Sequence, residues 1–386
     1  MASPGKTRVL TLIDKLLVDG GGERLALELT RALDPSRFER TLCVTRWDPA
    51  VAESETGRRL LGELSDGSVD FLGLERRSKL APAAWSRLRR HLQEQRIDVL
   101  HAHKFGSNFW GTIVGRAAGV PVIVAHEHSW SYEGAPLRRL LDRHVIGRYA
   151  DAFVAVSEED RRRMIEVERI PAAKVRFIPN GMPALPGPGS STDLRRELGL
   201  GSGPVIGAVS TVRPEKALDS LVRAAALLRP RFPELTVVIA GAGEIAELAG
   251  LAAELGIEDA VRLLGFRPDV AAVLGTLDVA VNCSVREGSP ISVMEYMEAA
   301  LPIVATRVGG VPDLVEDGVT GTLVRPGDPA ELARAIAELL EHPERAAAMG
   351  ERGRERRRSH FDLGAMARRV EALYDELLAR RKRERA

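Results

Sequence analysis

Short apolar runs alternate with amphipathic helical segments along most of this 386-residue chain. Such runs indicate strands buried on both faces, and strands separated by helices are typical of a parallel sheet covered by helices. The pattern therefore predicts a doubly wound α/β domain over residues 1–181. Its expected strands are residues 8–14, 40–47, 69–74, 97–103, 120–128, 151–157 and 175–181.

A stretch dense in Pro, Gly and Ser follows at residues 182–203, and this composition is typical of a linker. The alternation then restarts and predicts a second doubly wound domain over residues 204–360, with residues 361–386 forming a C-terminal helix. Ligands of such sheets bind at the carboxyl ends of the strands, so we expect a shared ligand in the cleft between the two domains. The expected strands of the second domain are residues 204–211, 235–243, 260–266, 277–284, 301–310 and 321–328.

The composition narrows the class of protein. Hydrophobic residues at 45% and charged residues at 28% exclude disordered and fibrous chains. Since the 55 basic residues are nearly balanced by 54 acidic residues, the net charge of the chain predicts no nucleic-acid partner. Cys43 and Cys283 lie inside apolar runs and form neither a disulfide framework nor a zinc-ligand set, so a reducing cytoplasm is the expected compartment.

Two features bear on membranes. The chain has no run of about 18 apolar residues and no signal-peptide pattern, so we expect neither a membrane span nor export. Basic residues gather at 352–360 and 380–385. They suit either a solvated Arg-rich helix or peripheral contact with anionic lipid at the inner face of the membrane.

The segment "REGSPISVMEYMEAA", residues 286–300, follows an apolar run and predicts a helix. Ser289 is the expected N-cap and Pro290 the first helical residue. Glu287 then lies in the loop before the helix and Glu295 in its second turn. A helix N-terminus after a strand attracts anions, but an ordinary strand-to-helix turn explains the local pattern equally well. The expected buried face of the helix carries Ile291, Met294 and Met297.

Two glycine-rich runs also follow predicted strands. Gly20, Gly21 and Gly22 open a helix, where their backbone N–H groups can approach a phosphate closely. The run lacks the Lys-Ser/Thr ending of a P-loop, so Walker-type nucleotide hydrolysis is not indicated. The run at residues 239–246, which contains Gly241, matches a dinucleotide fingerprint. The next strand ends at Arg267 rather than at a carboxylate, so a dehydrogenase is only a distant option.

Histidines and cations occupy further strand ends. His128 closes the run at 120–128 and should project at a carboxyl edge, where it can donate a hydrogen bond to a ligand oxygen. For His101 and His103 a structural role is the simpler interpretation. His126 and His128 could chelate a metal, but no carboxylate or cysteine cluster with ligand spacing accompanies them.

A further strand-to-helix turn, residues 210–221, carries two cations. Arg213 and Lys216 lie there and would complement a diphosphate, although a solvated helix start fits the same residues.

In order and spacing these features resemble the retaining nucleotide-sugar glycosyltransferases of family 4, which have the GT-B fold. The matching motifs extend from Gly20 to Asp328 and include "GGGER", "DVLHAH", "GVPVIVAHEH", "VAVSEED", "IPNG", "RPEK" and "EGSP" followed by Glu295. The resemblance implies two Rossmann-like domains facing a central cleft, with the last helix crossing back to the first domain. It also implies retention of the anomeric configuration by front-side attack, with the leaving diphosphate taking the acceptor's proton.

The resemblance also implies roles for individual residues. Lys216 would bind the donor diphosphate and neutralise the leaving group, His128 would contact the donor sugar, and Glu295 would accept the ribose hydroxyls. It implies a nucleoside-diphosphate sugar, linked to UDP or GDP, as co-substrate, and no essential metal or other cofactor. The expected catalytic residues are His128, Lys216, Arg213 and Glu287. The expected donor-binding residues are Gly20, Gly21, Lys216, Arg213, Gly241, Glu287, Gly288, Ser289, Pro290, Ile291 and Glu295.

Two positions depart from the family pattern. Thr211 stands where many relatives carry arginine, and Arg213 is the cation expected to replace it. Ala300 stands where relatives usually have glycine. The expected acceptor is a hydroxyl of a glycan, a lipid-linked glycan or a small molecule, in envelope polysaccharide or related glycoconjugate synthesis. The alternatives are a non-catalytic sugar-nucleotide-binding subunit and an epimerase or phosphorylase of GT-B architecture. The sequence does not name the sugar, the nucleotide, the acceptor or the oligomeric state.

Overall fold

The computed structural model describes residues 5–16, 21–49, 53–78, 80–129, 135–185 and 191–385. The chain divides into two compact units, of which unit 1 comprises residues 1–181 with 363–386 and unit 2 comprises residues 182–362. The division falls after Gly181, the last residue of the first expected domain.

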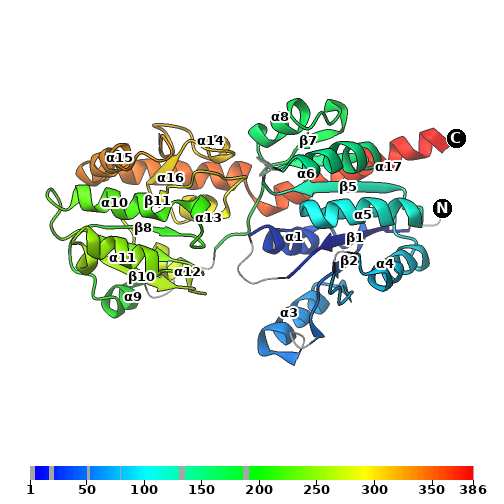
Figure 1. Cartoon of the computed structure of the whole chain (residues 1–386), viewed down its shortest axis with the longest axis horizontal. Helices are drawn as coiled ribbons and strands as arrows, with labels where there is room; N and C mark the ends of the chain where they lie inside the picture. The colour runs from blue at the N-terminus through cyan, green and yellow to red at the C-terminus, as the bar shows by residue number, and fades with distance from the viewer. Residues whose placement is uncertain are drawn as a thin grey trace. The chain divides into compact units, whose positions relative to one another are not determined.

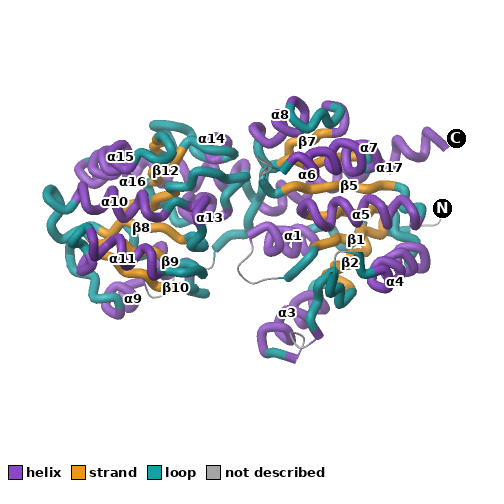
Figure 2. Tube along the Cα trace, in the orientation of Figure 1, coloured by secondary structure: helices purple, strands orange, loops and turns teal. Residues whose placement is uncertain are grey.

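Unit 1 is built on a parallel sheet in the order β3-β2-β1-β4-β5-β6-β7 (Figures 1 and 2). Its strands correspond one to one with the apolar runs of the first half, although the first two begin one and two residues earlier than expected and the other five are shorter than expected. They are β1 Thr7–Ile13, β2 Phe38–Val44, β3 Val69–Gly73, β4 Val99–His103, β5 Val122–Glu127, β6 Ala152–Ala155 and β7 Val175–Phe177.

Helices cover both faces of this sheet. Side chains alternate across a strand, so Leu100 and Ala102 of β4 point to one face and His101 and His103 to the other. The first face is covered by α5, whose Gly111 lies directly against Ala102. The second is covered by α1 and α17, which pack together. The helices of unit 1 are α1 Gly21–Ala32, α3 Glu55–Asp66, α4 Pro82–Glu94, α5 Lys104–Ala118, α6 Pro136–Leu141, the π-helix η1 Asp142–Ile146, α7 Gly147–Tyr149, α8 Glu158–Glu166, the 3-10 helix η2 Ala172–Lys174 and α17 Leu363–Arg385.

Unit 2 repeats this design with a parallel sheet in the order β10-β9-β8-β11-β12-β13. Its strands match the apolar runs of the second half and are β8 Val205–Val209, β9 Thr236–Ala240, β10 Val261–Gly265, β11 Val279–Asn282, β12 Ile303–Thr306 and β13 Thr322–Val324. Its helices are α9 Ser191–Glu197, α10 Leu218–Leu228, α11 Ala246–Glu254, α12 Val270–Leu274, α13 Ile291–Glu298, α14 Val311–Leu314, α15 Pro329–Glu341 and α16 Pro343–His360, with the 3-10 turns η3 Pro214–Lys216 and η4 Glu258–Ala260.

The stretch expected to be a linker is not wholly irregular. Residues 186–190 lie outside the described residues, but residues 191–197 form α9. Leu194 is 3% exposed and belongs to the core of unit 2, with Leu198 packed against it. Leu194 and Leu198 are four residues apart and form an apolar stripe on the helix. The high content of Pro, Gly and Ser in this stretch led to the prediction of a linker instead.

In both sheets the strands that come first and fourth along the chain are neighbours, and the strand order reverses between them. The loops that leave these two strands diverge toward opposite faces of the sheet, and ligands of open α/β sheets bind in the resulting crevice. In unit 1 this switch point lies after β1 and β4, and in unit 2 it lies after β8 and β11.

Candidate functional site

The switch point of unit 2 brings together the cation and the carboxylate that the sequence singled out. Lys216 follows β8 and Glu287 follows β11. The ammonium of Lys216 donates to both carboxylate oxygens of Glu287, at 2.7 and 2.9 Å. The side chains of Lys216 and Glu287 are 19% and 7% exposed, so this ion pair is largely removed from water.

Further hydrogen bonds fix the Glu287 carboxylate. Asn282 Nδ2 donates to its Oε1 at 3.2 Å, and Ser284 Oγ donates to the same oxygen at 2.6 Å. Sequence reasoning missed Asn282 and Ser284. Both lie at the end of an apolar run, and two polar residues at the carboxyl end of a buried strand are the signal that could have found them.

The loop after Glu287 rests on the glycine loop at residues 309–310. The N–H of Gly310 donates to the carbonyl of Gly288 at 2.7 Å. Gly309 has a φ of +52°, and a Cβ there would lie 1.8 Å from the carbonyl oxygen of Glu287. Only glycine allows this approach, and the two contacts fix the backbone of Glu287 and Gly288 against the glycine loop.

Helix α13 carries the other predicted residues, and its start differs from the prediction. The helix begins at Ile291 with Pro290 as N-cap, and the cap makes no side-chain hydrogen bond. The expected cap at Ser289 is therefore wrong by one residue, because the Ser-Pro pair keeps an extended backbone up to Pro290, with ψ at 121°. Glu295 lies in the second turn, as expected, and is 6% exposed.

The remaining predicted residues of unit 2 have different surroundings. The side chain of Arg213 is exposed and makes no hydrogen bond or ion pair with any described residue, whereas its backbone carbonyl accepts from the Lys216 N–H at 2.9 Å. Gly241 is required by packing, since a Cβ there would lie 1.9 Å from the carbonyl oxygen of Ser210. Ala300 adopts a φ of +54°, a left-handed conformation that favours glycine, which gives a physical reason for the family's usual residue.

The switch point of unit 1 collects histidines and a lysine. His128 directly follows β5, and its Nε2 lies 3.0 Å from Nδ1 of His103 at the end of β4. The start of α1 lies beside them, because a Cβ on Gly22 would come within 2.8 Å of Lys104 and 3.1 Å of His128. Gly21 is the first residue of that helix, whereas Gly20 lies outside the described residues.

Lys104 is a functional candidate that sequence reasoning missed. It directly follows His103 at the carboxyl end of β4, and its backbone has a φ of +67°. Its ammonium is 2.5 Å from Glu23 in the first turn of α1. A cation directly after a buried strand was the available signal.

The imidazoles of His101, His103, His126 and His128 form a stacked row on one face of the sheet. Burial lowers the pKa of all four side chains, and that of His126 falls to about 3. Neighbouring rings lower the pKa of His101, His103 and His128 further, and Lys104 adds to this for the last two. All four are therefore neutral at physiological pH, and His128 can offer a hydrogen bond but no positive charge.

Among the described residues, His101, His103 and His126 form the group that could hold a metal, with ring nitrogens within 4.8 Å of one another. Both nitrogens of His101 are already engaged. Its Nδ1 lies 2.6 Å from the Tyr374 hydroxyl and its Nε2 lies 3.1 Å from Nδ1 of His126. A metal bound to His101 would have to replace one of these two hydrogen bonds, so the geometry favours the structural role expected for His101. His103, by contrast, supports His128 directly.

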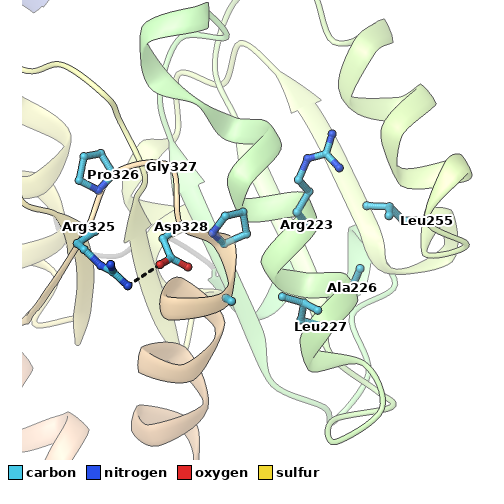
Figure 3. A pocket seen from close by; sticks show the side chains of 10 residues that line it. Arg223, Ala226, Leu227, Leu255, Arg325, Pro326, Gly327 and Asp328 are labelled. Carbon is cyan, nitrogen blue, oxygen red and sulfur yellow. Dashed lines mark hydrogen bonds and ion pairs between the residues drawn. The ribbon is translucent and has the colours of Figure 1, made fainter.

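The structure also contains features that the site does not use. A surface groove of about 600 Å³ in unit 2 lies between α10 and the start of α15 (Figure 3). It is lined by Arg223, Leu227 and the segment 325–330, and it contains none of the predicted residues. Cys43 and Cys283 are free and buried, and burial raises the pKa of Cys283 to about 12, so neither thiol suits nucleophilic chemistry. Within the described part of the chain, none of the helices combines the length and the apolar character needed to cross a bilayer.

Comparisons with known proteins identify the family of the chain. Residues 19–184 match the family model described as Glycosyltransferase Family 4, and residues 190–356 match the model described as Glycosyl transferases group 1. The chain is 34% identical over 291 residues to the GDP-mannose-dependent alpha-(1-6)-phosphatidylinositol monomannoside mannosyltransferase of Mycolicibacterium smegmatis, covering 71% of this chain and 75% of that protein. It is 32% identical over 309 residues to the D-inositol 3-phosphate glycosyltransferase of Thermobispora bispora, covering 74% of this chain and 72% of that protein.

Solved structures agree on the fold. Anabaena Alr3699/HepE in complex with UDP superposes with a TM-score of 0.82 at 22% identity, covering 96% of this chain and all of that one. Sucrose-phosphate synthase from Thermosynechococcus elongatus gives a TM-score of 0.80 at 20% identity, covering 97% of this chain and all of that one. The parallel sheets, the glycine-rich switch points and the matched relatives lead to one conclusion: this chain belongs to the family 4 glycosyltransferases of the GT-B fold and uses a nucleotide sugar.

Proposed function

We propose that the protein is a retaining glycosyltransferase that moves a hexosyl group from a UDP- or GDP-linked sugar to a hydroxyl acceptor. The acceptor belongs to envelope polysaccharide, lipid-linked glycan or related glycoconjugate synthesis. The observation that carries the proposal is the Lys216–Glu287 ion pair at the switch point of unit 2. The similar mycobacterial protein described as GDP-mannose-dependent and the similar fold bound to UDP support the two nucleotide options.

Lys216 is proposed to bind the donor diphosphate. Its ammonium carries three protons, and Glu287 accepts at 2.7 and 2.9 Å, so at least one proton stays available for a phosphate oxygen. Glu287 also fixes the position of Nζ, so the cation needs no reorganisation as negative charge develops on the leaving group. Arg213, exposed in the same loop, is proposed to supply a second cation in place of Thr211.

The other residues of the proposed donor site bind the nucleotide sugar and orient its sugar ring. Glu295 accepts the ribose hydroxyls. Glu287, with the backbone held by Gly309, positions the sugar. His128 donates a hydrogen bond to the sugar through Nδ1, the buried ring nitrogen that Nε2 leaves free when it pairs with His103. The backbone of Gly288, Ser289, Pro290 and Ile291 is proposed to complete the sugar contacts. Gly21 and Gly241 are proposed to contact the diphosphate, as is Gly20, which is outside the described residues.

The proposed reaction breaks the bond between the anomeric carbon and the diphosphate while the acceptor hydroxyl attacks the same face. The departing diphosphate takes the acceptor proton, so no protein base is required. Catalysis then depends on positioning and on cations aimed at the leaving group. The neutral His128 fits this scheme, since it adds no positive charge beside an oxocarbenium-like carbon.

We propose that the enzyme has no resident metal and acts in the cytoplasm, with peripheral contact at the inner face of the membrane. The first point is supported by the engaged nitrogens of His101 and is tested by turnover after exhaustive chelation, which should be unchanged. The cytoplasmic location is supported by two free buried thiols, and cell fractionation tests both the location and the membrane contact.

A donor panel tests the proposed function. Thermal unfolding is measured with nucleoside diphosphates and nucleotide sugars, because a ligand of the folded state raises the midpoint by mass action. The expected result is stabilisation by one nucleotide class, followed by sugar transfer whose product keeps the donor's anomeric configuration by NMR. An inverted product would refute the retaining mechanism, and no response to any UDP or GDP compound would refute the donor assignment.

A further inference from the structure

Tyr296 is a fully buried residue of unit 2 that the proposed function does not use. It lies on α13 directly after Glu295 and is 0% exposed. Its hydroxyl accepts a hydrogen bond from the N–H of Val209 at 2.8 Å and donates one to the carbonyl of the same residue at 3.1 Å. Val209 is the last residue of β8, so one hydroxyl joins the helix that carries Glu295 to the strand that leads to Lys216.

The strands β8 and β11 separate just before Val209. The ladder between them covers Ile206 and Gly207 of β8, whereas the ladder between β8 and β9 continues to Val209. Backbone groups of a strand point alternately to its two neighbours, so Val209 points to the same side as Val205, which bonds to Asp278 before β11. The phenol therefore takes the place of β11 as the hydrogen-bond partner of Val209.

The chemistry of this position requires a hydroxyl. Buried backbone N–H and carbonyl groups are almost always paired, because leaving them unpaired is costly. A hydroxyl donates and accepts at once, so a single side chain satisfies both groups of Val209. Burial also raises the pKa of Tyr296, so the phenol keeps the proton that the carbonyl of Val209 accepts.

The loop that leads from β8 to Lys216 is anchored to both neighbouring strands. On the side of β9, the N–H of Val212 donates to the carbonyl of Ala242 at 2.8 Å. On the side of β11, the N–H of Val285 donates to the carbonyl of Glu215 at 2.9 Å. The phenol adds a bond from the start of this loop to α13, the helix of the proposed ribose contact.

Apolar side chains bury α13 without fixing its position. Val293, Met294 and Met297 are each 0% exposed, but apolar contacts are non-directional and methionine adapts to its surroundings. Glu298 pairs with Arg357 at 3.1 Å, which connects the end of α13 to α16 rather than to β8. Hydrogen bonds depend on distance and angle, so the phenol gives α13 a defined position against β8.

We propose that Tyr296 is a positioning residue of the donor site, which fixes the separation between Glu295 and Lys216. This inference rests on the proposed function, in which Glu295 accepts the ribose hydroxyls and Lys216 binds the diphosphate. A nucleoside diphosphate reaches both groups through one short covalent link, so its affinity depends on their separation. Two groups that are already correctly spaced need no ordering on binding, and this preorganisation strengthens binding.

The conservative variant Tyr296→Phe tests the proposal by removing only the hydroxyl. Calorimetry, in direct and displacement form, measures the binding of UDP and GDP, of uridine and guanosine, and of inorganic pyrophosphate. We expect the diphosphate that binds the unaltered chain to bind about fivefold or more weakly to the variant, since each side chain that must be ordered on binding costs about 2- to 10-fold. The nucleoside and pyrophosphate should change by less than about twofold, because each engages one end of the site only.

The matched control is Tyr374→Phe, which removes the hydroxyl of another tyrosine that is 0% exposed, in unit 1. That hydroxyl lies 2.6 Å from Nδ1 of His101, for which the geometry favours a structural role. Both variants should lower the midpoint of urea unfolding, since each loses a buried hydrogen bond. The control should bind the diphosphate as the unaltered chain does.

A second background keeps the test available when Tyr296→Phe alone does not fold. Ala300→Gly relieves a left-handed backbone in unit 2 and is expected to raise stability. The same binding constants are then compared between Ala300→Gly and the double variant Ala300→Gly/Tyr296→Phe. The expected loss of diphosphate affinity is the same in this background.

Three outcomes would overturn the proposal. A diphosphate affinity changed by less than about twofold in Tyr296→Phe would leave the phenol a structural role only. Equal weakening of the nucleoside, pyrophosphate and the diphosphate would show that the whole site is disturbed rather than the separation of its two ends. Equal loss of diphosphate affinity in Tyr374→Phe would trace the effect to global stability. Absence of UDP and GDP binding by the unaltered chain is a different result, since it would refute the proposed function and this inference with it.

Discussion

The ion pair between Lys216 and Glu287 gives the sharpest prediction. Lys216→Met removes the charge but keeps a stem of similar length. At 2.7 to 2.9 Å and an effective dielectric constant of about 20, the attraction between the two charges is roughly 6 kcal/mol before desolvation. Asn282 and Ser284 still donate to the orphaned carboxylate in the variant. We therefore expect the free energy of unfolding to fall by about 3 kcal/mol, which is the lower end of the range for removing one partner of a buried ion pair.

The same variant should lose turnover. If Lys216 stabilises the leaving diphosphate, its removal should lower kcat by about 10²- to 10³-fold, the range for loss of one preorganised transition-state contact. Lys216→Arg should also lose activity, because a planar guanidinium cannot place one nitrogen between the two oxygens of Glu287. Lys216 is the only lysine between residues 182 and 362 in a chain of seven lysines and 48 arginines, which fits a requirement for a compact ammonium.

The assay combines urea unfolding with initial rates of nucleotide release. All four tryptophans lie between residues 47 and 130, so their fluorescence does not report on unit 2, and circular dichroism is the appropriate probe. A double-mutant cycle with Glu287→Gln isolates the coupling between the two side chains. A coupling energy below about 0.5 kcal/mol would refute the ion pair. Loss of stability with an unchanged kcat would refute the catalytic role and leave a structural one.

Three further predictions follow from other sites. Glu295→Ala should weaken nucleoside-diphosphate binding by about 10- to 100-fold, since it removes a charged hydrogen-bond acceptor; unchanged affinity by calorimetry would contradict the donor assignment. The pKa of His126 is about 3 in the folded chain and about 6.5, the ordinary value, in the unfolded chain. Between pH 6.5 and pH 3 the unfolded chain therefore binds a proton that the folded chain does not, and the free energy of unfolding falls as the pH drops through this range. His126→Gln should remove about 1.4 kcal/mol per pH unit of this slope below pH 6.5, measured by urea unfolding; an unchanged slope would mean that the ring titrates normally. Ala300→Gly should raise the free energy of unfolding by about 0.5 to 1 kcal/mol by relieving its left-handed backbone, and a lower midpoint would argue against that strain.

Much of the fold followed from local patterns. Each apolar run became a strand at its expected place, because a buried strand of a parallel sheet must be apolar on both faces. The loop position of Glu287 and the second-turn position of Glu295 were also predictable, since they depend only on where β11 ends and α13 begins. Composition was a weaker guide, and it concealed the helix at residues 191–197.

The partners within the site were decided by the tertiary structure. Lys216 and Glu287 are 71 positions apart, His103 and His128 are 25 apart, and His101 and Tyr374 are 273 apart. The hydrophobic periodicity of the sequence cannot predict such pairs. They form only when folding makes two strands neighbours or places a distant helix over the sheet.

The sequence by itself determined the strands, the glycine loops and the family, because these depend on spacing along one chain. Only the tertiary structure decided that His101 is engaged by Tyr374 and that His103 supports His128. It also showed that the basic stretch 352–360 is used within unit 2, whereas Arg380 and Arg381 line a cationic cavity. The physical reason is common to all of these cases: the chemistry of an ionisable side chain is set by burial and by neighbours that folding brings from far along the chain.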